Sequence, residues 1–156
     1  MQFSINEIEA LLSKAARGGG APAGQASTFG KAAALHLARG CDVDDVQIAL
    51  RALPDGPIIL CPVDLHAALA NGGGAMPCDG HELLCSYAMA LPYLVTQTDS
   101  GVTIDMLQYD KPKLPARLSI EAGVIDAWKA LAALTYVPET EQSRQAGAGA
   151  GLTDND

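Results

Sequence analysis

The sequence predicts an α+β fold in which N-terminal helices pack on a small mixed or antiparallel sheet, followed by a C-terminal helix and a glycine-rich tail. Three observations indicate it. Apolar residues recur at helical spacing in the first fifty residues, short apolar segments bounded by turns fill much of the middle, and helical spacing returns near residue 125. The composition agrees, because 27 alanines and 19 leucines against seven aromatic residues favour helices that pack closely through small side chains.

Length and charge limit the classes of protein to which the chain can belong. Its 156 residues suit one domain, since domains cluster at roughly 100–150 residues. A hydrophobic share of 49% with 18% charged residues excludes a fully disordered chain. We expect a single domain over residues 1–146 and an acidic tail over residues 147–156. The formal charge of −8 argues against nucleic acid and anionic membranes as partners, because both attract a basic face.

Helix start and stop signals predict three helices before residue 54. Ser4 and Glu7 form a capping box, in which each side chain bonds the backbone amide of the other residue. Acidic residues favour the N-terminal end of a helix, and a glycine after the last turn favours its C-terminal end. The expected helices run from Ser4 to Gly18-Gly19-Gly20, from about Gly24 to Arg39 before Gly40, and from Asp42 to Leu53.

The rest of the chain mixes strands and helices. Ile58-Ile59-Leu60-Cys61 is a short apolar run between turn residues, which predicts a buried strand. A short helix is expected after Asp64, and another after the capping-box pattern Asp79-Gly80-His81-Glu82. The remaining expected elements are a hairpin of Tyr93–Thr98 and Val102–Leu107, a strand at Leu114–Ile120, and a helix from about Glu121 to Leu134 that packs Trp128 against the sheet.

No targeting or membrane segment is expected. The first residues carry no basic region, and the longest apolar run, Tyr87 to Val95, falls far short of the roughly 20 residues that a membrane span requires. We therefore expect a cytoplasmic location and no membrane partner. In that compartment the four cysteines are expected to be reduced, with at least two of them buried.

The nearest approach to a metal site is Cys78-x2-His81-x3-Cys85. On a helix that starts at Asp79, His81 and Cys85 would lie one turn apart, and Cys61 or His66 could complete a tetrahedral zinc site. The pattern lacks paired Cys-x2-Cys ligands, and isolated cysteines are commonly buried. We expect core thiols, no metal and no cofactor, and keep a zinc-stabilised domain as an alternative.

Charge is unevenly distributed along the chain. Residues 52–110 hold seven acidic residues and no lysine or arginine. The expected explanation is a solvated acidic face, partly balanced by Lys111, Lys113 and Arg117, because blocks of charge usually serve solvation. The alternative is a surface that attracts a cation or a basic partner.

The candidate ligand-binding residues are Lys14, Arg17, Ser143 and Arg144. Lys14 and Arg17 precede the glycine loop at the end of the first helix, and Ser143 and Arg144 precede the glycine-rich tail. If the tail folds back, the four side chains form a small anion-binding cleft. The simpler explanation is that the cations stabilise helix C-termini.

Two segments resemble a known family. Asn6-Glu7-Ile8-Glu9-Ala10 with Lys14-Ala15-Ala16-Arg17-Gly18 near the start, and Thr135-Tyr136-Val137-Pro138, Glu141, Ser143-Arg144 and Gly147–Gly151 near the end, are similar to bacterial proteins grouped as domain of unknown function 3726. The sequence departs from that pattern at Ala23, where the resemblance implies tryptophan, and at Ser27-Thr28, where it implies acids. The resemblance implies a fold unit and no particular chemistry.

These observations favour a non-catalytic ligand-binding or accessory protein of metabolism, assembled as a homo-oligomer. No Gly-x-Ser-x-Gly elbow or catalytic cysteine context occurs, and His36 is expected to be a hydrogen-bonded core histidine. The alternative is a small enzyme acting on an acidic carboxylate or phosphate metabolite, with Lys14, Arg17 and Arg144 as its anion clamps.

Overall fold

The computed structural model describes residues 1–78, 80–110 and 113–135, which form six helices and five strands. In chain order the elements are β1 (Gln2–Ser4), α1 (Ile5–Gly18), α2 (Ala23–Ala38), α3 (Val43–Arg51), α4 (Pro57–Ala70), β2 (Gly74–Pro77), α5 (Glu82–Met89), β3 (Tyr93–Thr98), β4 (Gly101–Tyr109), β5 (Arg117–Ser119) and α6 (Ala122–Ala133). Both sheets in the described chain are antiparallel, one of order β2-β4-β3 and one of β1 with β5. The predicted α+β class is confirmed.

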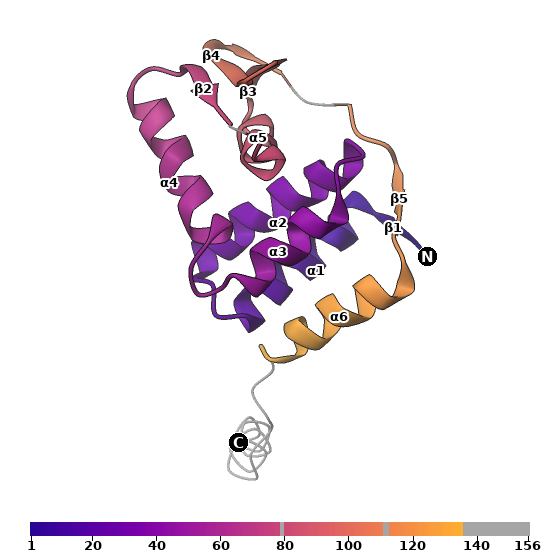
Figure 1. The fold of residues 1–156 in the computed structure, drawn as a ribbon. Coiled ribbons are helices and arrows are strands. Elements are labelled where there is room, and N and C mark those ends of the chain that lie inside the picture. The colour runs from indigo at the N-terminus through magenta and orange to yellow at the C-terminus, as the bar shows by residue number, and fades with distance from the viewer. Residues whose placement is uncertain (79, 111–112, 136–156) are drawn as a thin grey trace, which may run out of the picture.

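The elements are stacked in successive layers (Figure 1). Helix α6 packs along α1, α1 packs on α2, α2 packs on α5, and α5 contacts β3 and β4. Trp128 is 1% exposed, as the predicted burial requires. It lies on a helix that packs on α1, however, and not against the three-stranded sheet as expected.

Small residues bring α1 close to its neighbours. A Cβ atom added at Gly30 of α2 would overlap Ser13 Oγ of α1, and one added at Gly18 would overlap the backbone carbonyl of Leu131 in α6. The alanine-rich composition is consistent with this close packing, because four alanines of α2 are buried: Ala26, Ala32, Ala33 and Ala34.

The predicted helix boundaries in the first fifty residues are close to those observed. Ser4 Oγ accepts a hydrogen bond from the Glu7 amide, and Glu7 Oε2 accepts one from the Ser4 amide, so the capping box is present. Asp42 caps α3 by accepting from the amide of Asp44. Gly40 follows α2 with a φ of +80°, a backbone conformation that favours glycine.

The predicted strand at Ile58–Cys61 is wrong, because these residues belong to α4. Pro57 occupies the first turn, where its fixed φ suits a helix and its missing N–H costs nothing. Ile58 and Cys61 face the core one turn apart, while Leu60 points outward with 57% of its surface exposed. A run of four apolar residues is equally compatible with a buried strand and with a helix that is apolar on several sides.

The predicted hairpin is confirmed, with β4 extending two residues beyond the expected Leu107. Val102 and Ile104 are buried on one face of β4, as their alternation indicates. The strand expected over Leu114–Ile120 is shorter and forms only β5, and the short strands β1 and β2 were not predicted.

Two further expectations concern residues that the structure does not describe, and a third concerns membrane spans. Helix α5 begins after His81 without a side-chain cap, and Asp79, the cap expected from the sequence, lies outside the described residues. The tail over residues 147–156 also lies outside them, so the division at residue 146 stays a prediction. No helix among the described residues combines the length and apolar character that crossing a bilayer requires.

Candidate functional site

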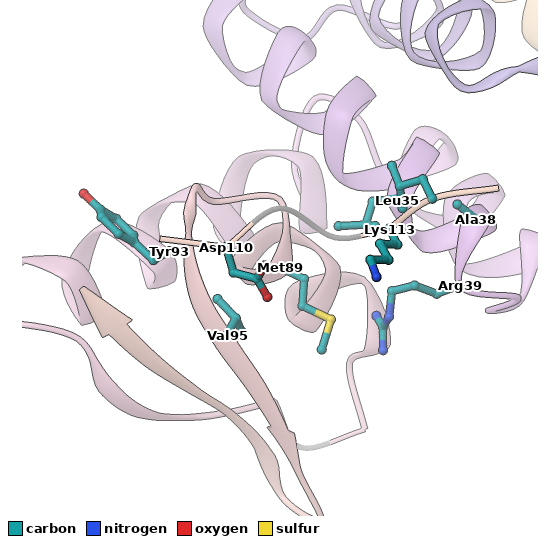
Figure 2. A pocket seen from close by; sticks show the side chains of 9 residues that line it. Leu35, Ala38, Arg39, Met89, Tyr93, Val95, Asp110 and Lys113 are labelled. Carbon is teal, nitrogen blue, oxygen red and sulfur yellow. The ribbon is translucent and has the colours of Figure 1, made fainter. Parts of the chain in front are cut away.

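A cavity of about 230 Å³ lies where the end of α2 meets α5 and strand β3 (Figure 2). Its apolar lining comes from Leu35, Ala38, Met89, Tyr93, Val95 and Leu114. Three charged residues share the lining: Arg39, Asp110 and Lys113. The cavity therefore offers an apolar wall and ionic groups to the same occupant.

Arg39 is held in place from two elements. As the residue that caps the C-terminus of α2, it donates from Nη1 to Ser86 Oγ of α5 at 3.0 Å and from Nη2 to Gln97 Oε1 of β3 at 2.8 Å. The Glu82 carboxylate lies 3.9 Å from Nη2, and the Arg39 side chain is 20% exposed. Since a guanidinium carries five N–H donors, these two bonds fix its plane while leaving donors for a ligand.

A buried histidine lies behind the Arg39 contact. His36 is fully buried; its Nδ1 lies 3.1 Å from Ser86 Oγ, and its Nε2 lies 3.0 Å from the Asp42 carbonyl oxygen and 3.3 Å from Asp45 Oδ2. Both neighbours of Nε2 are acceptors, which assigns a proton to Nε2. His36 is thus the hydrogen-bonded core histidine that the sequence predicts.

Asp45, His36 and Ser86 contact one another in that order, but they do not form a nucleophilic site. Ser86 is fully buried and its Oγ accepts from Arg39, while its single hydroxyl hydrogen is shared between two acceptors, the Glu82 carbonyl oxygen at 3.0 Å and His36 Nδ1 at 3.1 Å. A nucleophile must reach a substrate, and this hydroxyl is enclosed by its own hydrogen-bond partners. The arrangement positions Arg39.

The cysteines likewise give no support to covalent catalysis. Burial, with a smaller effect of the Asp64 charge, raises the pKa of the Cys61 thiol to about 11. Burial also raises the pKa of Cys41. Because the thiolate is the reactive form, both groups are protonated and weakly nucleophilic near neutral pH. All four cysteines are free thiols and three of them are buried, in agreement with the prediction that at least two are.

Lys113 approaches the cavity from the connection that follows β4. Figure 2 shows its ammonium group on the same side of the cavity as the Arg39 guanidinium, close to the Met89 side chain. The Lys113 side chain is exposed. Arg39 and Lys113 contribute two positive charges to the lining, and Asp110 contributes one negative charge. Cations therefore outnumber acids among the lining residues.

The structure describes only two of the four residues of the anion-binding cleft predicted from the sequence. Lys14 and Arg17 are exposed on the surface of α1, as expected for outward-facing residues. Ser143 and Arg144 lie outside the described residues, so the convergence of the four side chains stays a prediction.

The metal alternative gains no support from the described residues. Within residues 1–78, 80–110 and 113–135, no three His, Cys, Asp or Glu side chains gather closely enough to hold a metal ion. Cys78 and Cys85 are buried, and His81 precedes α5.

No motif in the sequence marks Arg39 or Lys113 as a ligand-binding residue, but the distribution of charge contains one signal. Residues 52–110 contain no lysine or arginine, so any cation near the β3–β4 hairpin must come from outside that block. Arg39 precedes the block and Lys113 follows it, and folding brings both to one cavity.

The comparisons with known proteins returned no match for this chain: no family model, no curated protein and no solved structure is similar to it. The resemblance to domain of unknown function 3726 therefore stays an expectation from the sequence.

Proposed function

We propose that this protein is a non-catalytic binding protein for a small organic anion, which it holds in the cavity beside Arg39. The observation that carries the proposal is a guanidinium fixed by Ser86 and Gln97 at an apolar-lined cavity. A planar fork of N–H donors matches the two oxygens of a carboxylate. Lys113, on the same cavity, adds a second attractive charge.

The fixed position of Arg39 supports a binding role in energetic terms. Ordering a flexible side chain at an interface costs about 0.5–1.5 kcal/mol, and a side chain already held by two hydrogen bonds avoids most of that cost. Arg39 is also largely buried, so solvent screens its charge less than that of a fully exposed arginine.

The size of the cavity favours a small ligand. Its volume of about 230 Å³ is below the roughly 300–1,000 Å³ that is usual for sites of drug-sized molecules. A compact metabolite fits this space better than a nucleotide or a long lipid.

The binding function is preferred to the enzyme alternative because the polar groups around Arg39 are already engaged. Ser86 is enclosed, and His36 is bonded at both ring nitrogens. An enzyme that used Ser86 or His36 as its reactive group would need that group open to the cavity, and neither is. The cytoplasmic location and the homo-oligomer remain predictions, and sedimentation of the purified chain tests the second.

Calorimetric titration of a panel of small organic anions tests the proposed function. At least one anion should bind saturably, and Arg39→Gln should weaken it at least tenfold. Lys113→Gln should weaken it by up to about fivefold, because exposed ion pairs contribute about 0.2–1 kcal/mol.

Lys129→Gln is the matched control, since it removes the same charge from the exposed face of α6. It should leave the affinity unchanged. Lys14→Gln separates this cavity from the cleft predicted from the sequence. Equal binding by the Arg39 and Lys129 variants would contradict the proposal, and a loss confined to the Lys14 variant would favour the predicted cleft.

A further inference from the structure

We infer that the ligand is a monocarboxylate with a short apolar chain, and not a phosphate ester or a dicarboxylate. The inference rests on the proposed anion-binding function and narrows it to one class of ligand. Four features of the cavity carry it: its charge balance, the helix ends beside it, its apolar wall and its volume.

The charge balance of the cavity suits one negative charge. Arg39 and Lys113 are opposed by Asp110 within the lining, and the Glu82 carboxylate lies 3.9 Å from the Arg39 guanidinium. The second carboxylate of a dicarboxylate would lie either against the Glu82 carboxylate or along the apolar wall, and both places disfavour a negative charge. A monocarboxylate places its one charge on the Arg39 fork and its uncharged alkyl chain along the apolar wall.

The helix ends beside the cavity disfavour a phosphate. Ala38 is the last residue of α2 and Met89 is the last residue of α5, and both line the cavity. A helix carries about half a negative charge at its C-terminus, whereas phosphate sites commonly use the positive N-terminus and its free amides. The Arg39 fork can overcome this field for a single carboxylate, to which it donates two parallel hydrogen bonds.

The apolar wall gives the rest of the ligand a place to bind. Leu35, Met89, Val95 and Leu114 come from α2, α5, β3 and the connection after β4. The Met89 side chain lies beside the guanidinium in Figure 2, and a flexible thioether adapts to chains of different shape. An acid whose carboxylate meets Arg39 would therefore lay its alkyl chain along this wall.

A titration followed by ¹H–¹⁵N NMR at pH 7.5 tests the inference with five probes: hexanoate, acetate, hexanamide, adipate and inorganic phosphate. We expect hexanoate to bind with shifts at the amides of residues 35–39, 89, 95 and 114. Acetate should bind more weakly by about fourfold for each methylene that the wall buries. Hexanamide, adipate and phosphate should each bind at least tenfold more weakly than hexanoate.

Two variants test the two ends of the site separately. Lys113→Gln should weaken hexanoate and acetate by the same factor, because both carry the carboxylate. Leu114→Ser should weaken hexanoate and leave acetate unchanged, because it removes only wall contact; Leu114 is 39% exposed, so the variant should fold. Leu107→Ser, at a side chain 93% exposed on β4, is the matched control and should change neither affinity.

The outcomes distinguish the inference from the function on which it rests. If phosphate or adipate binds more tightly than hexanoate and the Lys113 and Arg39 variants weaken it, the anion site stands and the monocarboxylate inference is overturned. Equal binding of hexanoate and hexanamide likewise overturns the inference. If no probe binds, or if binding does not respond to Lys113→Gln and Arg39→Gln, the proposed function fails together with the inference.

Discussion

The layer of α1, α2 and α6 and the three-stranded sheet differ in how completely their side chains are packed. In the helical layer Ile8, Leu12 and Phe29 have no exposed surface, and glycines let neighbouring helices touch. In the sheet, Leu107 and Tyr109 at the end of β4 are 93% and 78% exposed. The cavity lies between these two regions: α2 of the closely packed layer carries Arg39 at its C-terminal end, and Gln97 of β3 in the more exposed sheet helps to fix its guanidinium.

The largest expected effect of a substitution lies in the helical layer. Trp128→Ala should lower the free energy of unfolding by about 3–5 kcal/mol, the usual cost of removing a large buried aromatic side chain. Urea denaturation followed by far-UV circular dichroism measures it. Lys129→Ala, at the exposed neighbouring residue, is the control and should change stability little. An unchanged midpoint for Trp128→Ala would show that α6 does not close this layer.

Trp128→Phe refines the same prediction. The indole Nε1 of Trp128 has no hydrogen-bond partner among the described residues. Phenylalanine keeps much of the apolar contact and removes a buried donor, so Trp128→Phe should cost much less than Trp128→Ala. A loss as large as that of the alanine variant would indicate that Nε1 has a partner in solution.

A smaller effect is expected at the contact between α1 and α2. Gly30→Ala should destabilise the protein by about 1–3 kcal/mol, because the new methyl group overlaps Ser13 and one of the helices must move. Gly24→Ala in the same helix meets no atom within 4 Å and should stabilise by about 0.4–1 kcal/mol through the unfolded chain. The urea denaturation midpoints of the two variants should shift in opposite directions from that of the unaltered chain. A shift in the same direction would contradict the close packing of α1 on α2.

The smallest effect is expected on the sheet. Leu107→Ser should change the free energy of unfolding by no more than about 0.5 kcal/mol, as substitutions at exposed positions usually do. A thermal melt compared with that of the unaltered chain measures it. A loss above about 1 kcal/mol would mean that the β4 surface is covered in solution, and sedimentation of both proteins would then test the predicted homo-oligomer.

Local signals account for the parts of the fold that were predicted. The capping box of Ser4 and Glu7, the turn at Gly40 and the alternation of Val102 and Ile104 act within a few residues, and the structure confirms them. The short strands β1 and β2 depend on partners far along the chain, which no local pattern reveals. At Ile58–Cys61 the local pattern was ambiguous, and packing against α5 and α2 selects the helix.

The candidate site was less predictable than the fold for the same reason. Arg39 and Lys113 stand apart in the sequence and share no motif, so only the folded chain brings them to one cavity. Lys14 and Arg17 are candidates from the sequence because they precede a glycine loop, and the end of α1 alone explains that loop. The absence of cations from residues 52–110 was the one long-range signal, because it limits which residues can serve the hairpin.

The pairing of β1 with β5 has a consequence for the order of folding. Phe3 pairs with Leu118, and α1 packs on both α2 and α6. During synthesis the α1–α2 hairpin can form as soon as both helices have left the ribosome, because its contacts are local. The other side of α1 stays uncovered until α6 has been synthesised, and β1 stays unpaired until β5 has been synthesised. A nascent chain therefore presents an apolar helix face and an unpaired strand until nearly all of residues 1–135 have been made, and this interval is when a chaperone would be needed.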